Sequence, residues 1–142
     1  MDRLAIADLV HGYAQGVDRN DGPAVAALFT DDGVLAVRSK VGEPEPDTVR
    51  RGRREIADTI SAMDYRATCH VVASHTAVVD GDRATGETRC IAHHVLGPPG
   101  NDTDRVWYIR YVDTFRRTPE GWRIATRDLW LEITANGPLT TI

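Results

Sequence analysis

The order of the apolar patterns along the chain limits its fold more than any other feature of the sequence. Apolar residues recur at helical spacing from Leu4 to Val17, and a second, shorter helix is predicted from Pro23 to Phe29. From His70 to Leu131 the apolar residues follow strand-like patterns that are separated by turn residues. Helices followed by a run of strands indicate an α+β domain, in which the helices pack on one face of a curved, mostly antiparallel sheet.

Two shorter elements are predicted between these regions. Val34–Val37 indicates a strand, and Glu55–Met63 indicates a third helix with apolar residues four positions apart. Residues 38–54 are predicted to form a polar loop. Its arginines are expected to form a solvated rim: Arg38, Arg50, Arg51, Arg53 and Arg54.

Turn residues divide the second half of the chain into strands. The Asp-Gly step at Asp80–Asp82 predicts a hairpin, and Gly97–Asp102 predicts a longer turn. Arg127 and Asp128 lie at the end of the last predicted strand, where either could reach the mouth of a cavity, and a surface ion pair is the favoured interpretation. A loose tail is expected at residues 133–142.

Length and charge narrow the classes of function. The chain has 142 residues and a net charge of −4, so one domain over residues 1–142, with its core at 3–132, is expected. The mild acidity argues against nucleic acid as a partner. No apolar run approaches the roughly 18 residues that a membrane helix needs, and the first residues carry no signal-peptide core. We expect a cytoplasmic protein with no membrane partner.

The sequence offers no motif for a cofactor. It lacks the glycine-rich nucleotide loops, the Gly-x-Ser-x-Gly elbow and the His-Glu-x-x-His zinc motif. Its two cysteines, Cys69 and Cys90, are too few for a disulfide framework or a zinc cluster. We therefore expect neither a cofactor nor a metal.

Asp18 and His70 are the first candidates for chemistry. Asp18 ends the apolar stripe of the first helix, where the helix dipole disfavours a negative charge unless a partner holds it. His70 begins an apolar strand. If the two side chains meet inside the sheet, the carboxylate would fix the imidazole tautomer and stabilise the imidazolium that forms when the histidine takes a proton. A structural core histidine is the alternative interpretation.

The other histidines are placed by the alternation of side chains along a strand. His75 differs from His70 in parity, so the two are expected on opposite faces of the sheet. His93 and His94 are adjacent and also point in opposite directions. Strand parity favours His94 as the inward residue, because it shares a face with the small, less charged residues of that strand.

The chain resembles the SnoaL-like domains of the nuclear transport factor 2-like superfamily over residues 3–132. Short segments in the family's order carry the resemblance: Tyr13–Asp18, Leu28–Val34, Gly52–Ile56, His70–Val72, Val79–Ala84, Tyr111-x-Asp113, Gly121–Ile124 and Arg127. The resemblance implies a cone-shaped α+β barrel, also called cystatin-like, with three N-terminal helices, an apolar cavity, and assembly into a homodimer or homotrimer.

The resemblance also implies catalytic residues. Scytalone dehydratase, bile acid 7α-dehydratase and hexachlorocyclohexane dehydrochlorinase use an aspartate and a histidine at the positions of Asp18 and His70. Tyr13 matches the catalytic tyrosine of the bile acid dehydratase. The dehydratases add a polar group on the next strand, where alignment favours His93 and parity favours His94.

The sequence thus favours a cofactor-independent lyase or isomerase, of the dehydratase type, that acts on a small apolar cyclic or polycyclic substrate. His70 would be the base and Asp18 would orient it. Tyr13, with His93 or His94, would polarise a carbonyl or protonate a leaving hydroxyl. The alternatives are a non-catalytic small-molecule-binding or accessory module of the same fold, and a polyketide cyclase that uses the same base.

Overall fold

The computed structural model describes residues 1–39 and 43–139. In these ranges it contains three helices and six strands, which follow each other as α1 (Asp2–Asp18), α2 (Gly22–Ala27), β1 (Phe29–Arg38), β2 (Thr48–Arg51), α3 (Gly52–Ser61), β3 (Ala67–Asp80), β4 (Arg83–Leu96), β5 (Thr103–Thr118) and β6 (Gly121–Pro138). The strands form a single sheet in the order β2-β1-β6-β5-β4-β3. Only β1 and β6 run parallel to each other. The predicted α+β class is confirmed.

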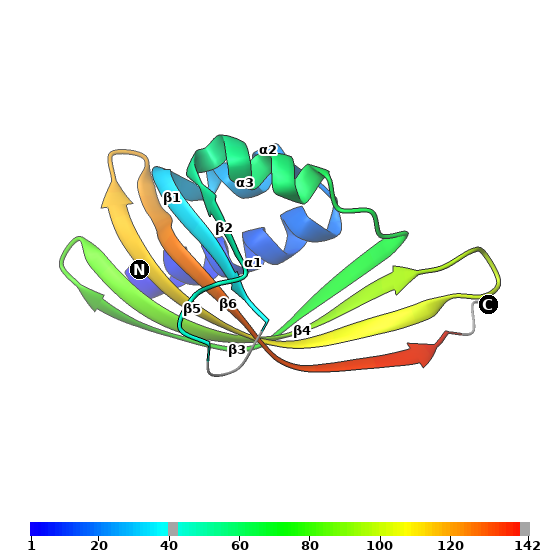
Figure 1. The fold of residues 1–142 in the computed structure, drawn as a ribbon. Coiled ribbons are helices and arrows are strands. Elements are labelled where there is room, and N and C mark those ends of the chain that lie inside the picture. The colour runs from blue at the N-terminus through cyan, green and yellow to red at the C-terminus, as the bar shows by residue number, and fades with distance from the viewer. Residues whose placement is uncertain (40–42, 140–142) are drawn as a thin grey trace.

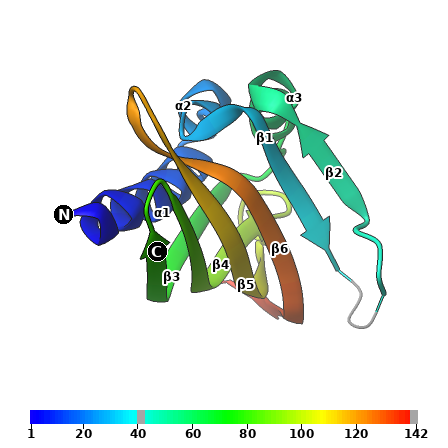
Figure 2. The ribbon, with the colours of Figure 1, turned by 90° about the vertical axis from the view of Figure 1, so that its left-hand side faces the viewer.

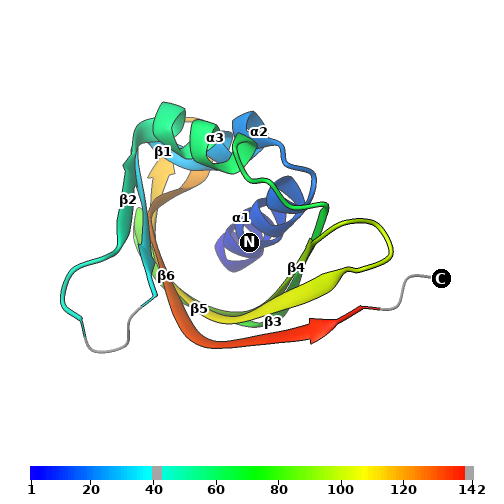
Figure 3. The same ribbon diagram turned by 45° about the vertical axis from the view of Figure 1, so that its right-hand side comes forward.

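The sheet curls around the first helix (Figures 1 and 3). α1 packs against β3 and β6, while α2 and α3 pack on each other, and α3 also contacts β1. β2 and β3 are the two edges of the sheet, as the side view in Figure 2 shows. We call the face of the sheet toward α1 the inner face. Within the described ranges, no helix has both the length and the apolar character needed to cross a membrane.

Alternation along the strands sorts the side chains between core and surface. The inner face of β4 buries Cys90, Ala92 and His94, and β5 buries Ile109 and Tyr111. These residues meet the apolar stripe of α1, whose buried members are Ile6, Leu9, Val10, Tyr13, Ala14, Gly16 and Val17. The helix therefore fills one side of the cone, and its last turn lies over the start of β3.

A glycine allows the other two helices to approach closely. A Cβ atom at Gly22 would lie 2.2 Å from the carbonyl oxygen of Ala57, which is shorter than any van der Waals contact. Only glycine fits at this position of α2. The close contact fixes α3, and with it the start of the segment at residues 62–66 that leads into β3.

Two parts of the chain differ from the sequence prediction. The predicted polar loop contains β2, because Thr48–Arg51 pairs with Val34–Val37 of β1. The predicted loose tail at 133–142 continues as β6 to Pro138, because the start of β5 pairs with it. In both cases a neighbouring strand supplies hydrogen bonds that local composition does not reveal. Residues 140–142 lie outside the described part of the chain.

A β-bulge corrects the predicted orientation of His75. The register of β3 on β4 shifts by one residue between Val72 and Ser74. His75 consequently pairs with Thr88 on the inner face, and its Nδ1 lies 2.9 Å from the Thr88 hydroxyl. The expectation that His75 and His70 face opposite sides is wrong, since the parity argument assumes an unbroken strand.

A buried ion pair joins β5 and β6. Arg127 donates from Nε and Nη2 to the two carboxylate oxygens of Asp113, at 2.9 and 2.7 Å, and both residues are 1% exposed. The guanidinium carbon of Arg127 lies 4.2 Å from the ring centres of both Tyr13 and Tyr111. The predicted surface pair of Arg127 with Asp128 is therefore wrong: Arg127 faces the core, and Asp128 contacts Arg38 instead.

Arg127→Met should lower the free energy of unfolding by about 3–5 kcal/mol, because it leaves the Asp113 carboxylate buried without a partner. Adding Asp113→Leu should recover most of the loss, since an apolar pair of similar volume then replaces two charges. Urea denaturation measures both effects. The control is Arg116→Met, which breaks the exposed pair with Asp32 and should cost less than about 1 kcal/mol. Equal losses for Arg127→Met and Arg116→Met would contradict this account.

Candidate active site

Asp18 and His70 meet where the end of α1 crosses the start of β3. Asp18 Oδ1 lies 2.7 Å from His70 Nδ1, and the same carboxylate accepts hydrogen bonds from the backbone N–H of His70 and the hydroxyl of Thr68, both at 2.9 Å. The His70 side chain is 5% exposed and the Asp18 side chain 27% exposed. The carboxylate of Asp18 thus orients the imidazole of His70 and at the same time fixes the end of α1 against the start of β3.

This contact determines the tautomer of His70. A carboxylate can only accept at neutral pH, so Nδ1 carries the proton and Nε2 keeps its lone pair. Burial lowers the pKa of His70, and the hydrogen bond and charge of Asp18 oppose that shift only in part. The ring is therefore neutral near pH 7 and can accept a proton at Nε2.

His70 lines a cavity of about 180 Å³ under α1. The polar groups in its wall are Tyr13, Thr59, Tyr65, His70, His94 and Tyr111, and the remaining lining residues include Val17, Leu35, Ile60, Met63, Trp107, Ile109 and Leu129. Helices α1 and α3 and strands β1, β3, β4, β5 and β6 each contribute. An apolar cavity with a few converging polar groups is typical of a small-molecule site.

His94 is the histidine of the adjacent pair that faces this cavity. It is 1% exposed, and its Nδ1 donates to the carbonyl oxygen of Arg105 at 3.1 Å. The centre of its ring lies 4.7 Å from that of Tyr65 and 4.4 Å from that of Trp107. Burial lowers the pKa of His94, so it too is neutral with a lone pair on Nε2. His93 lies on the opposite face, with its Nδ1 2.6 Å from Asp104.

Tyr13 supplies a hydrogen-bond donor to the same cavity. Burial raises the pKa of Tyr13 to about 12, although the nearby Arg127 guanidinium acts in the other direction. The phenol therefore stays protonated at neutral pH. The rings of His70 and His94 lie 5.7 Å apart. The cavity thus contains two neutral imidazoles that can accept, and Tyr13 is one of three phenols in its wall that can donate.

Several residues of the site carry no clear signal in the sequence. Thr68 could have been found, because it lies two residues before His70 and therefore on the same side of the strand. Tyr65 lies in the irregular segment between α3 and β3, where no periodicity assigns a direction to its side chain. Across the described residues, no three His, Cys, Asp or Glu side chains cluster in a way that could hold a metal ion.

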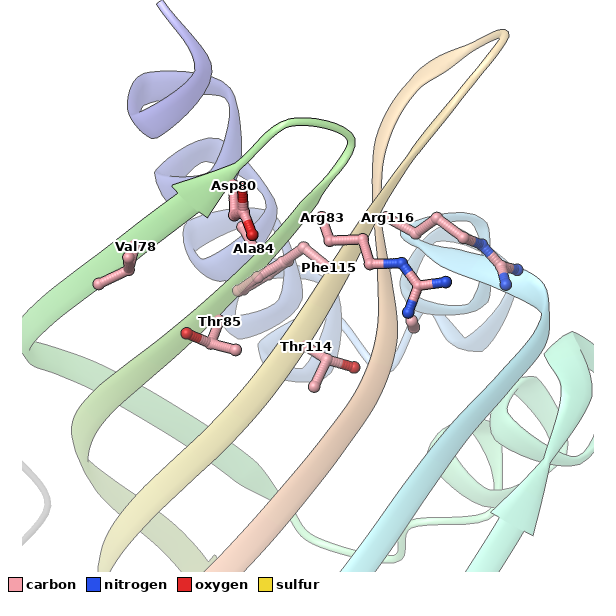
Figure 4. Close-up of a pocket in the computed structure, with 9 residues that line it drawn as sticks. Val78, Asp80, Arg83, Ala84, Thr85, Thr114, Phe115 and Arg116 are labelled. Atoms are coloured by element: carbon pink, nitrogen blue, oxygen red, sulfur yellow. The ribbon is translucent and has the colours of Figure 1, made fainter.

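A larger, open hollow of about 500 Å³ lies away from these groups (Figure 4). It is near the β3–β4 hairpin, on the face of the sheet opposite α1, where Val78, Thr85 and Thr114 form part of its surface. Arg83 and Arg116 lie at its rim. None of the groups that converge on the inner cavity reaches it.

The curved sheet with a helix inside it is the fold of nuclear transport factor 2-like proteins. The model of the SnoaL-like domain matches residues 1–128, and the chain belongs to that family. A nuclear transport factor 2-like protein with a cystatin-like fold from Novosphingobium aromaticivorans is 32% identical, with a TM-score of 0.72, and the match covers 92% of this chain and 81% of that one.

Two further solved structures share the fold at lower identity. A candidate scytalone dehydratase from Novosphingobium aromaticivorans is 22% identical with a TM-score of 0.78, over 94% of this chain and 85% of that one. A hexachlorocyclohexane dehydrochlorinase from Novosphingobium barchaimii is 18% identical with a TM-score of 0.77, over 99% and 91%. The predicted resemblance to the family is confirmed.

His94→Gln should make stability less sensitive to acid. The folded pKa of His94 lies below its unfolded value of about 6.5, so the unfolded chain binds more protons between the two values and stability falls as the pH is lowered through this window. Glutamine does not titrate. The slope of the unfolding free energy against pH should therefore drop by up to about 1.4 kcal/mol per pH unit.

Urea denaturation between pH 7 and pH 5 measures this slope. His11→Gln is the matched control, because His11 is exposed on α1. It should leave the slope as in the unaltered protein. A slope that stays the same in His94→Gln would contradict the burial argument.

Proposed function

We propose that this protein is a cofactor-independent lyase or isomerase that uses His70 as a general base on a small apolar cyclic substrate. The observation that carries the proposal is the 2.7 Å contact of Asp18 with His70 Nδ1, which leaves Nε2 free for a proton in a site of low exposure. The dehydratase and dehydrochlorinase that share the fold carry the names of elimination enzymes, and this agrees with the proposed class.

The proposed reaction is the loss of water from a cyclic β-hydroxy ketone. His70 Nε2 takes the proton next to the carbonyl, and the electron pair of the C–H bond moves onto the carbonyl oxygen, to which the Tyr13 hydroxyl donates. When the carbonyl forms again, the C–O bond of the hydroxyl breaks. The leaving oxygen takes the proton from the His70 imidazolium and departs as water. Asp18 stabilises that imidazolium while it exists.

His94 has a different role in this scheme. Because its Nδ1 donates to the Arg105 carbonyl, the neutral ring offers only an acceptor to the cavity. It is suited to hold the hydrogen of the substrate hydroxyl rather than to protonate it. In an isomerisation, His70 would return its proton to another carbon and the C–O bond would stay intact.

A non-catalytic binding module is the second candidate. The observation that favours it is that Asp18 also accepts from Thr68 and from the His70 backbone, so the carboxylate has a structural use without any reaction.

A cyclase would use the same base on a polyketide. Assembly into a homodimer or homotrimer and a cytoplasmic location stay predictions from the sequence.

Asp18→Asn and His70→Gln should each lower kcat/KM for the dehydration of β-hydroxycyclohexanone by about 10²–10⁴-fold, the usual contribution of a placed general base. The rise in absorbance of the conjugated enone measures the rate. Asparagine would also donate to Nδ1 and so favour the wrong tautomer.

His93→Gln is the control, because His93 lies on the opposite face of the sheet and is paired with Asp104. It should retain the rate of the unaltered protein. Rates in His70→Gln equal to those of His93→Gln would contradict a base at His70. A large loss of stability in Asp18→Asn with no turnover by the unaltered protein would favour the binding module.

A further inference from the structure

A second, smaller hollow lies beside the inner cavity. It has a volume of about 130 Å³, and its outer lining includes Arg19, Asn20 and Arg66. Three residues line both spaces: Val17, Met63 and Tyr65. These three side chains are therefore the wall between the inner cavity and the hollow next to it.

Of the three residues that form this wall, one belongs to a helix and two belong to an irregular segment. Val17 belongs to α1, while Met63 and Tyr65 lie in residues 62–66, between α3 and β3. Both ends of this segment are held. The N–H of Met63 donates to Ile60, and the N–H of Arg66 donates to Val95 at 2.9 Å while its side chain pairs with the buried carboxylate of Asp102. The segment thus presents Tyr65 in a defined position.

The Tyr65 ring also contacts a polar group of the site. It lies 4.7 Å from the ring of His94, and the ring of His94 lies 4.4 Å from that of Trp107. The rest of the cavity wall belongs to α1, α3 and the paired strands, for example Ile60 on α3, Ile109 on β5 and Leu129 on β6. Moving those residues would disturb a helix or the sheet, whereas Met63 and Tyr65 lie outside both, so these two side chains can change the size of the space most directly.

The volume of the inner cavity limits what it can hold. At about 180 Å³ it is close to the roughly 150 Å³ of an engineered cavity that binds benzene. Joining it with the neighbouring hollow of about 130 Å³ would add room for a second ring, so the wall that holds Tyr65 limits the space beside the first ring. We propose that the site takes a ring of one six-membered cycle with a hydroxyl for His94, and that Tyr65 is the residue that excludes a second ring. This extends the proposed function by naming the substrate class of its cavity.

Calorimetric binding of phenol and β-naphthol tests the size limit. The two probes carry the same hydroxyl and differ by one fused ring. The unaltered protein should bind phenol at least tenfold more tightly than β-naphthol. Tyr65→Ala should join the two hollows and reverse this preference, while Tyr65→Phe, which keeps the ring, should not.

Two variants make the test independent of folding defects. Met63→Ala opens the same wall from a second position and should also gain β-naphthol binding, so it decides the outcome where Tyr65→Ala does not fold. Tyr108→Ala removes a tyrosine that is 40% exposed and should bind both probes like the unaltered protein.

The size limit is overturned if the unaltered protein binds β-naphthol as tightly as phenol, if it binds neither, or if opening the wall does not change the preference. These outcomes are separate from a failure of the proposed function. Binding is measured without turnover, so intact phenol selectivity together with no dehydration would reject the catalytic proposal and leave the role of Tyr65 standing.

Discussion

The carboxylate of Asp18 is the contact on which the arrangement of the site depends. It joins the last residue of α1 to the first residues of β3 by accepting from a hydroxyl, a backbone N–H and an imidazole at once. A negative charge at a helix C-terminus is unfavourable by itself. Three donors from β3 offset that cost, so the same bonds place the helix against the sheet and orient the ring of His70.

The pleat of the sheet then brings the other groups to the same cavity. His70 pairs with Ala92 on β4, and His94 lies two residues further along the same face. Tyr13 reaches this space from α1, about one and a half turns before Asp18. Residues far apart in the chain therefore meet because each lies at a regular spacing from the contact of α1 with β3.

Local patterns predicted the parts of the fold that depend on local spacing. The helix that ends at Asp18 and the hairpin at Gly81, which adopts a positive φ of 57°, are examples. Features that depend on a distant partner were missed: β2 needs β1, and the bulge before His75 is visible only in the register with β4. Parity favoured His94 as the inward residue but alignment favoured His93, so the sequence left this choice open. Arg127 was misplaced, because a charged side chain is buried only with a partner and the sequence does not identify Asp113 as that partner.

The charges around the cavity suit a reaction that places negative charge on a carbonyl oxygen. Both imidazoles are neutral, so neither stabilises an anion before a proton has moved. The buried cation behind the site is Arg127, whose guanidinium carbon lies 4.2 Å from the ring of Tyr13 and whose own charge is balanced by Asp113. This arrangement strengthens the phenol as a donor without ionising it. Proton uptake by His70 and charge development at the oxygen would then occur at two neighbouring carbon atoms of the substrate, so the base and the phenol would act on the same part of the molecule.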